Sequence, residues 1–186
     1  MMAQLEVRGK SLKILLGVSA GIAVYKVTDL ASKLTQRGDE VRTLMTPQAQ
    51  RFMTPVAFRA VTQQQVYTDI FDEDPSSRPE HISLSEWCDL VFIAPATADL
   101  IARLAAGMGD DIVTVTLLAC QKPVVVVPAM NDRMWAHPAV IRNLKTLKDF
   151  GYRVIEPDAG HLACGSFGAG RLPEVDPMLS VIDEWR

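Results

Sequence analysis

The feature that most constrains the fold of this chain is a repeated order, in which a short apolar run precedes a segment with helical periodicity. The clearest run, residues 123–128 (PVVVVP), holds four consecutive valines, as is typical of a strand buried on both faces. Similar runs predict further strands at residues 12–18, 41–45, 89–94 and 153–156. Strands that alternate with helices through short connections predict a parallel sheet covered on both faces, which is an α/β fold in three layers.

The segments between these runs predict the covering helices. Apolar spacing predicts helices at residues 22–37, 97–106 and 138–150, and another that Pro47 opens and that carries Phe52 and Phe58. Residues 72–79 (DEDPSSRP) are polar and contain two prolines, so we expect an exposed loop there. Residues 157–173 are glycine-rich and too long for a tight turn, so we expect a functional or disordered loop.

Length, charge and cysteine content exclude or disfavour several classes of protein. The 186 residues fit one domain, residues 1–186, and we expect residues 1–11, before the first strand, to be disordered. A net charge of −3 disfavours nucleic acid as a partner. No apolar run approaches the roughly 20 residues that span a membrane, and the N-terminus does not resemble a secretory signal. The three cysteines form no paired motif, so a reducing, cytoplasmic location is the simplest interpretation.

Four unusual segments directly follow predicted strands. They are GVSAGIA (17–23), MTPQA (45–49), APATAD (94–99) and PAMNDRMW (128–135). Open parallel sheets bind ligands just beyond the carboxyl ends of their strands, where these segments lie. The sequence therefore predicts that the loops leaving adjacent strands converge on one ligand pocket.

Taken one at a time, these segments leave alternatives open. The small residues of GVSAGIA could seat an anion at a helix N-terminus, or Gly17 and Gly21 could only permit a tight turn. Thr97 and Thr46 could contact a ligand, or each could cap the helix that follows. The pattern is not GxGxxG, and the second strand ends in Met45 and Thr46 instead of an acidic residue. NAD is therefore disfavoured, whereas a mononucleotide is not.

Three histidines are candidates for acid–base chemistry. His81 follows the polar loop and stands near a predicted helix start, so it is a candidate general base, with a surface or capping role as the alternative. His161 lies in the glycine-rich segment and stays a candidate. His137 has no obvious partner. The histidines and cysteines lack the spacing of metal ligands, so we expect no metal site.

The cysteines divide into two kinds. Cys164 stands between Ala163 and Gly165 in the glycine-rich segment, so its thiol is expected to be exposed and able to act as an acid or a nucleophile. Cys88 and Cys120 follow apolar residues and are interpreted as core residues. Cys164 is therefore the candidate functional thiol.

Taken together, these motifs resemble those of the homo-oligomeric flavin-containing cysteine decarboxylases. PAMNDRMW matches the family's PxMNxxMW pattern at every fixed position, and ACGSFGAGR (163–171) matches ACGxxGxGR. GVSAGIAVYK, HISL and APATADLIARLAAGMGDD agree in order and approximate spacing, so that the resemblance runs from about Lys13 to Glu184. Ala20 is a mild departure, because bacterial members often carry Gly-Gly or Gly-Ser where this chain has Ala20–Gly21.

The resemblance implies a flavodoxin-like or Rossmann-like sandwich that binds FMN. It also implies homo-oligomers, namely trimers that can assemble into dodecamers, with the flavin at a subunit boundary where His81 acts on a neighbour's site. The implied FMN contacts are Ala20, Gly21, Ile22, Thr46, Thr97, Ala98, Asp99, Leu100, Ala129 and Met130.

The same resemblance implies roles for the candidate catalytic residues. His81 would assist as a base, Asn131 would bind the substrate carboxylate, and Cys164 would supply a proton. Residues 157–173 would form a lid in which Ala163 and Gly165 contact the substrate.

The implied reaction is the decarboxylation of 4'-phosphopantothenoylcysteine to 4'-phosphopantetheine in coenzyme A biosynthesis. FMN would oxidise the thiol side chain to a thioaldehyde, carbon dioxide would leave, and the resulting enethiolate would be reduced again. One alternative is oxidative decarboxylation of a peptide's C-terminal cysteine, as in lantibiotic synthesis, which stops at the enethiol and needs no acid for a reducing step. Another is a non-catalytic regulatory flavoprotein. Cys164 in its motif favours the first reaction.

Overall fold

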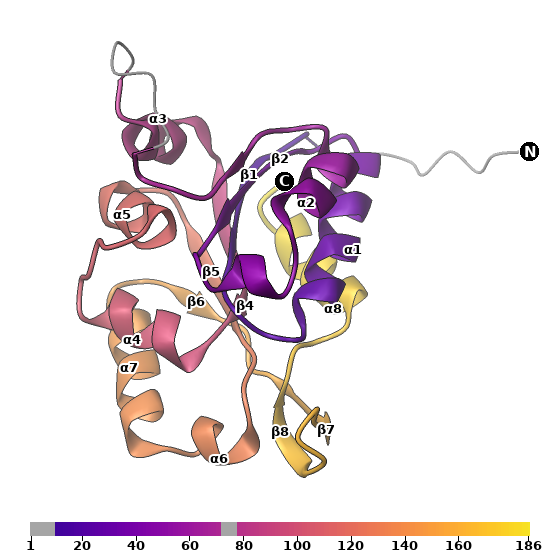
Figure 1. The fold of residues 1–186 in the computed structure, drawn as a ribbon, viewed down its shortest axis with the longest axis vertical. Helices are drawn as coiled ribbons and strands as arrows, with labels where there is room; N and C mark the ends of the chain where they lie inside the picture. The colour runs from indigo at the N-terminus through magenta and orange to yellow at the C-terminus, as the bar shows by residue number, and fades with distance from the viewer. Residues whose placement is uncertain (1–9, 72–77) are drawn as a thin grey trace, which may run out of the picture.

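The protein, described here from a computed structural model over residues 10–71 and 78–186, is built on a parallel six-stranded sheet with helices on both faces (Figure 1). The strands are β1 (Lys13–Val18), β2 (Glu40–Met45), β3 (Val66–Tyr67), β4 (Leu90–Ala96), β5 (Val124–Pro128) and β6 (Arg153–Val154). Their order across the sheet is β3-β2-β1-β4-β5-β6. This is the doubly wound Rossmann-like order, and without the edge strand β3 it is the flavodoxin-like order. The predicted fold class is confirmed.

Helices α1 (Val24–Gln36), α2 (Pro55–Thr62) and α8 (Val175–Asp183) cover one face of the sheet (Figure 1). Because side chains alternate along a strand, Ile14 and Leu16 of β1 point into this layer, where they join a core that includes Leu30, Phe58 and Ile182. Each of these five side chains is fully buried. An apolar core therefore fixes the position of α1, whose N-terminus follows the loop after β1.

The other face carries α3 (Glu80–Trp87), α4 (Ala98–Ala105), α5 (Ile112–Ala119) and α7 (Pro138–Asp149) (Figure 1). Leu15 of β1 points into this layer and shares its core with Ile93, Leu100, Val113 and Leu147. A short helix, α6 (Asp132–Trp135), lies between β5 and α7. The helices predicted at residues 22–37, 97–106 and 138–150 are therefore present, with ends that differ by a few residues.

The helix predicted to open at Pro47 is wrong. A short 3-10 turn, η1 (Ala49–Arg51), occupies that region, and α2 begins at Pro55. Thr54 has an extended backbone, at φ −76° and ψ 151°, as is favoured for a residue before proline. A helix from Pro47 therefore cannot continue through Thr54, whereas Pro55 fits the first turn of α2 because its missing N–H has no partner there.

Residues 157–173, expected to form a loop without regular structure, instead form a β-hairpin. Its antiparallel strands are β7 (Asp158–His161) and β8 (Phe167–Arg171). The glycines of β8 permit the hairpin to approach the end of β5 closely. A Cβ atom at Gly168 would stand 2.7 Å from Cβ of Asp132, and one at Gly170 would collide with the carbonyl oxygen of Met130. The main chain holds the contact, since the Met130 N–H donates to the Gly170 carbonyl oxygen at 2.9 Å.

Two of the sequence-based expectations fall largely outside the described residues. Residues 1–9 of the expected disordered segment and residues 72–77 of the expected loop lie there. Across residues 10–71 and 78–186, every helix is too short or too polar to span a lipid bilayer.

Candidate functional site

A cavity of about 680 Å³ opens at the carboxyl ends of β1, β4 and β5, beneath the β7–β8 hairpin. It is walled by the three loops that leave these strands and by the hairpin tip. The predicted site residues that line it are Ala20, Gly21, Ile22, Thr97, Ala98, Ala129, Met130, Asn131, Ala163 and Cys164. The structure therefore brings three of the four unusual segments together with the glycine-rich segment.

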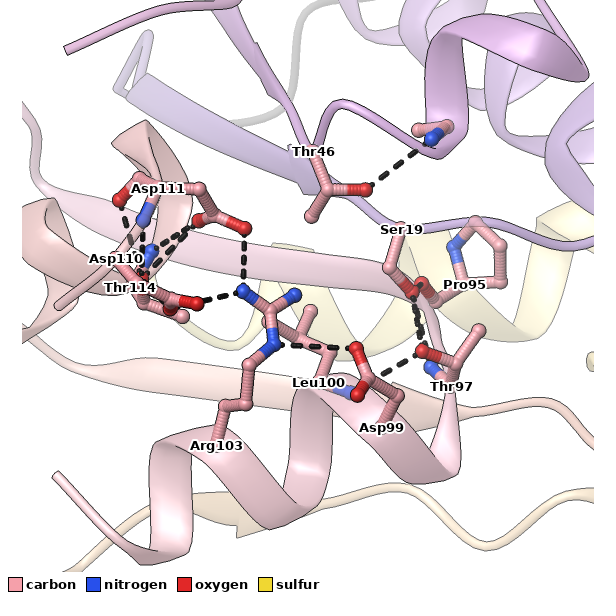
Figure 2. A network of polar contacts seen from close by, with 11 residues as sticks. Ser19, Thr46, Pro95, Thr97, Asp99, Leu100, Arg103, Asp110, Asp111 and Thr114 are labelled. Atoms are coloured by element: carbon pink, nitrogen blue, oxygen red, sulfur yellow. Dashed lines mark hydrogen bonds and ion pairs between the residues drawn. The ribbon is translucent and has the colours of Figure 1, made fainter. Parts of the chain in front are cut away.

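Ser19 joins the loop after β1 to the loop after β4 (Figure 2). Its hydroxyl donates to the carbonyl oxygen of Pro95 at 2.7 Å and accepts from the Thr97 N–H at 2.9 Å. The Ser19 side chain is almost fully buried, so these bonds are shielded from water. This contact fixes the spacing between the Ala20–Gly21 turn and the start of α4.

Thr97 caps α4, which is one of the two roles, ligand contact and helix capping, that the sequence left open for it. Its Oγ1 accepts from the Leu100 N–H at 3.2 Å, which satisfies one of the free donors of the first turn (Figure 2). Leu100 is buried in the core, and Asp99 is exposed and pairs with Arg103 at 3.1 Å. Neither Asp99 nor Leu100 lines the cavity. Their predicted flavin contacts stay predictions.

Arg103 holds α4 against the start of α5 (Figure 2). Its guanidinium lies 2.6 Å from a carboxylate oxygen of Asp111 and 3.1 Å from one of Asp110. Asp111 also caps α5, since it accepts from the Thr114 N–H at 2.9 Å in a reciprocal capping box. This ion-pair cluster supports the helix whose first turn forms the cavity wall.

Thr46 does not line the cavity. Its N–H donates to the carbonyl oxygen of Val18 at 3.0 Å. Its Oγ1 accepts from the Ala49 N–H at 3.2 Å, which is the dashed line drawn from Thr46 in Figure 2. The side chain therefore closes the turn from Thr46 to Ala49 before η1, and the helix that it was expected to cap is absent from this described part of the chain. Its flavin contact stays a prediction.

His81 lies far from the cavity within the chain. It stands at the start of α3, and Figure 1 shows α3 at the opposite end of the molecule from the β7–β8 hairpin. Its Nδ1 atom is buried and has no hydrogen-bond partner among the described residues. His81 can therefore reach such a cavity only from another copy of the chain, and its role as a base stays a prediction.

Asn131 and Cys164 meet on the cavity wall. Asn131 is the N-cap of α6, and its Oδ1 accepts from the Arg133 N–H at 2.9 Å. This bond turns the amide so that Nδ2 donates to the Sγ of Cys164 at 3.0 Å. Gly165, beside the thiol, has φ +88° in the left-handed region and does not line the cavity. The amide and the thiol therefore face one space from two different elements.

The three thiols differ in exposure and in acidity. Cys164 is exposed, Cys120 is half-buried and Cys88 is buried, so the predicted contrast between Cys164 and the other two is confirmed. Hydrogen bonds from Ser166 and then Asn131 lower the pKa of Cys164. The hydrogen bond between Cys88 and Cys120 raises the pKa of Cys88 and lowers the pKa of Cys120 to about 7. Cys164 is thus the one exposed thiol of the three, and hydrogen bonds lower its pKa.

Sequence reasoning missed several residues of the cavity wall. Lys26 is a lysine on the buried face of α1, and its Nζ donates to the Leu172 carbonyl oxygen at 3.1 Å and to Glu174 at 2.8 Å. Arg171 pairs with the same carboxylate of Glu174. Two cations therefore share one carboxylate and leave a net positive charge at the wall. The remaining missed residues are Ala23, Tyr25, Met134, Leu162, Gly170 and Leu172, and His161, which the sequence left open, also lines the cavity.

Lys26 could have been found from the sequence, because a lysine between Val24 and Val27 on an apolar helix face needs a partner. Within residues 10–71 and 78–186, no group of three or more His, Cys, Asp or Glu side chains is placed to hold a metal ion.

A comparison with known protein families shows to which family this chain belongs. The family model described as Flavoprotein matches residues 2–186. The chain belongs to the Flavoprotein family. The resemblance to the flavin-containing cysteine decarboxylases, seen first in the motifs, is thereby confirmed.

Individual members of the Flavoprotein family resemble the chain closely. The coenzyme A biosynthesis bifunctional protein CoaBC of Bacillus subtilis is 48% identical over 171 residues, which is 92% of this chain and 42% of that protein. The chain therefore spans about two fifths of the length of the curated relatives it matches.

Two solved structures also resemble this chain. A cysteine-to-serine mutant of PPC decarboxylase in complex with pantothenoylaminoethenethiol has a TM-score of 0.84 at 28% identity, and the match covers 95% of this chain and 98% of that one. The FMN-dependent cysteine decarboxylase SpaF has a TM-score of 0.79 at 35% identity, and the match covers 91% and 94% of the two chains.

Proposed function

We propose that this protein binds FMN and decarboxylates 4'-phosphopantothenoylcysteine to 4'-phosphopantetheine in coenzyme A biosynthesis. The observation that carries this proposal is the contact between Asn131 and Cys164, at 3.0 Å, on the wall of a cavity formed at the strand ends. An amide that can hold a carboxylate and a thiol that can give a proton are the two groups that a reductive completion of cysteine decarboxylation requires.

The cavity suits a phosphorylated, planar ligand. Its volume of about 680 Å³ lies within the range of about 300–1,000 Å³ that is typical of cofactor sites. Small residues line its floor, and a Cβ atom on Gly21 would meet only Pro95, at 3.8 Å, so the main chain is open to a ligand. The N-terminus of α1 at this floor has no side-chain cap and no acidic residue in its first turn, which favours an anion.

These features support FMN as the cofactor. The proposed contacts are the predicted ones that line the cavity, with Lys26 and Arg171 as additional cationic groups near the phosphates of cofactor or substrate. Thr46, Asp99 and Leu100 stay in the proposed set on the family resemblance alone, because they do not line the cavity and their side chains are committed to a turn, an ion pair and the core.

The proposed reaction divides between the bound FMN and the side chains of the site. FMN, when bound, supplies the oxidation of the substrate thiol and the later return of the hydride. The Asn131 amide holds the substrate carboxylate by hydrogen bonding, and the Cys164 thiol gives a proton to the carbon that becomes saturated. The β7–β8 hairpin, with Ala163 and Gly165 at its tip, acts as the lid that excludes water from the reacting carbon.

We further propose that the protein is a homo-oligomer, a trimer that can assemble into a dodecamer. Ile22 and Tyr25, which line the cavity near the start of α1, are each more than half exposed. Phe52 at the end of η1 and Val56 of α2 are also more than half exposed. Exposed apolar residues beside a cavity mark a contact surface. Docking a second copy there is the route by which a neighbour's His81 would reach the flavin and assist as a base.

The choice between substrates depends on the thiol. An enzyme that stops at the enethiol of a peptide needs no proton donor for a reducing step. The structure places the Cys164 sulfur on the cavity wall within hydrogen-bond distance of Asn131. This placement supports the coenzyme A reaction over oxidative decarboxylation of a peptide's C-terminal cysteine, and a purely regulatory role would leave it without a use.

The test is a comparison of two substrates by mass spectrometry. The FMN-loaded protein is incubated in parallel with 4'-phosphopantothenoylcysteine and with a peptide that ends in cysteine. We expect the first to lose carbon dioxide and no hydrogen, and the second to be unchanged. Loss of carbon dioxide with two hydrogens from the peptide alone would assign the oxidative reaction, and two unchanged substrates would reject the decarboxylase.

A further inference from the structure

Behind the Cys164 thiol lies a short chain of polar groups that joins the hairpin to α6. The Ser166 hydroxyl lies 3.2 Å from the Cys164 sulfur and donates to a carboxylate oxygen of Asp132 at 2.9 Å. The sulfur also accepts from Asn131 at 3.0 Å. None of the functions proposed above uses Ser166 or Asp132.

The Ser166 hydroxyl has one proton and two neighbours that can accept it. When Cys164 is a thiol, the S–H group can donate to Ser166 Oγ while Ser166 donates to Asp132, and every group has a partner. When Cys164 is a thiolate, it has no proton to give, and the Ser166 hydroxyl can turn from Asp132 to the sulfur and add to the hydrogen bond from Asn131. The carboxylate and the thiolate thus compete for the same hydroxyl proton.

We propose that Ser166 and Asp132 are positioning residues that act as a hydrogen-bond switch on Cys164, favouring its thiol form at rest and supporting its thiolate once the proton is given. The catalytic meaning of the switch rests on the function proposed above. In that reaction the thiol gives its proton to the substrate carbon, the hydroxyl of Ser166 turns to the sulfur, and a proton from water later restores the thiol.

The packing of the hairpin holds this arrangement in place. Gly168 lies so close to Asp132 that a Cβ atom on it would stand 2.7 Å from Cβ and 3.2 Å from Cγ of the aspartate. The Met130 N–H donates to the Gly170 carbonyl oxygen at 2.9 Å on the same strand. Ser166 therefore cannot move away from Asp132 unless the hairpin lifts off the end of β5.

Other ionisable groups near the thiol do not take part in the switch. On the cavity wall these are Lys26 of α1, His161 of β7 and Arg171 of β8, and α6 also carries Arg133 beside Asp132. Lys26 and Arg171 are paired with Glu174, and the His161 ring packs edge-on against Phe167. Among the described residues, none of these four makes a hydrogen bond to Cys164. The side chains of Ser166 and Asn131 therefore act directly on the sulfur, and Asp132 acts through Ser166.

The switch predicts shifts of opposite sign for its two members. Ser166→Ala removes the donor that stabilises the thiolate, so the pKa of Cys164 rises. Asp132→Asn removes a negative charge and leaves a neutral amide oxygen as a weaker competing acceptor, so the Ser166 proton is more available to the sulfur and the pKa of Cys164 falls. A residue with a merely structural role would not give this pair of results, because loosening the hairpin would move both variants the same way.

The experiment measures the rate of iodoacetamide labelling at Cys164 against pH, in the purified protein with FMN added. Peptide mapping by mass spectrometry separates Cys164 from Cys88 and Cys120. We expect the midpoint of the Ser166→Ala profile to rise and that of Asp132→Asn to fall, each by roughly one pH unit. Ser166→Thr, which keeps the hydroxyl, is expected to restore the wild-type midpoint, and Ser180→Ala, a control on α8, to leave it unchanged.

The proposed switch would be overturned if the pH midpoints of labelling are unchanged in Ser166→Ala and Asp132→Asn, or if they shift in the same direction. Because labelling requires no substrate, the result is independent of the proposed decarboxylation. Opposite shifts in a protein that leaves 4'-phosphopantothenoylcysteine unchanged would support the switch and reject the function. If both variants keep the wild-type midpoint while the wild-type enzyme decarboxylates 4'-phosphopantothenoylcysteine, the switch is rejected and the function is supported.

Discussion

The amide of Asn131 reaches the sulfur of Cys164 across 3.0 Å, although 33 positions separate the two residues in the chain. Asn131 follows strand β5, and Cys164 lies at the tip of the hairpin whose Gly170 contacts the end of that strand's loop at Met130. A substrate whose carboxylate binds the amide would therefore have its reacting carbons beside the thiol. The predictions below follow from this arrangement and from the elements that support it.

Replacing the thiol separates the two halves of the proposed reaction. We expect Cys164→Ser to retain oxidative decarboxylation but to release a product two hydrogens short of the wild-type product, because a serine hydroxyl is a far weaker acid than this thiol. Mass spectrometry of the product distinguishes the two outcomes. Cys120→Ser, at a thiol outside the cavity, is the control and should give the saturated product. Full turnover in Cys164→Ser would refute the role of the thiol.

Changing the amide tests the carboxylate site. Asn131→Asp keeps an N-cap for α6 but sets a carboxylate against the substrate carboxylate, and such like-charge contacts cost several kcal/mol. We expect turnover to fall by about 10²-fold or more, while visible absorbance shows flavin still bound. Asn143→Asp on α7 is the matched control. Unchanged turnover in Asn131→Asp would remove Asn131 from the site.

The hairpin contact can be tested with two glycines. Gly170→Ala places a methyl group against the Met130 carbonyl, and overpacking of this kind costs about 1–3 kcal/mol. We expect proteolysis within residues 158–171 to become about 5- to 150-fold faster as the hairpin opens more often. Gly151 also has positive φ but has open space around it, so Gly151→Ala should leave hairpin cleavage at the wild-type rate. Equal cleavage in both variants would show that close packing does not hold the hairpin down.

The cluster around Arg103 is expected to matter for stability. The Asp111 side chain is 5% exposed, and Arg103→Met would leave that carboxylate buried without its cation. We expect a loss of about 3 kcal/mol in the free energy of unfolding, measured by urea denaturation. Arg153→Met breaks an exposed pair with Glu184 and should cost less than about 1 kcal/mol. Similar losses in the two variants would contradict the difference in burial.

The sheet could be predicted because β1, β4 and β5 are short and almost entirely apolar, as is typical of strands covered on both faces. The helix α5 was missed because IVTVTLLA is apolar on every side and rich in β-branched residues, so its pattern does not mark one face. The capping box between Asp111 and Thr114 and the packing of α5 against α3 and α4 decide its conformation. The pocket position could be predicted, since it follows from the carboxyl ends of parallel strands.

The hairpin could not be predicted from local pattern. Its strands are built from small residues with no apolar alternation, and a tertiary contact stabilises them where Gly168 and Gly170 meet the segment after β5. The position of His81 likewise depends on the whole fold, and its link to the cavity depends on a second subunit. Lys26 and Arg171 were missed because their shared partner, Glu174, is distant from Lys26 in sequence.

Flavin uptake tests the central proposal most directly, since the pocket at the strand ends is proposed to hold FMN. FMN is titrated into the purified protein, while flavin fluorescence and visible absorbance are followed and the bound flavin is counted after gel filtration. We predict saturable binding of about one FMN per chain, with a yellow protein that retains the flavin on the column. A protein that stays colourless and takes up no added FMN would contradict the account.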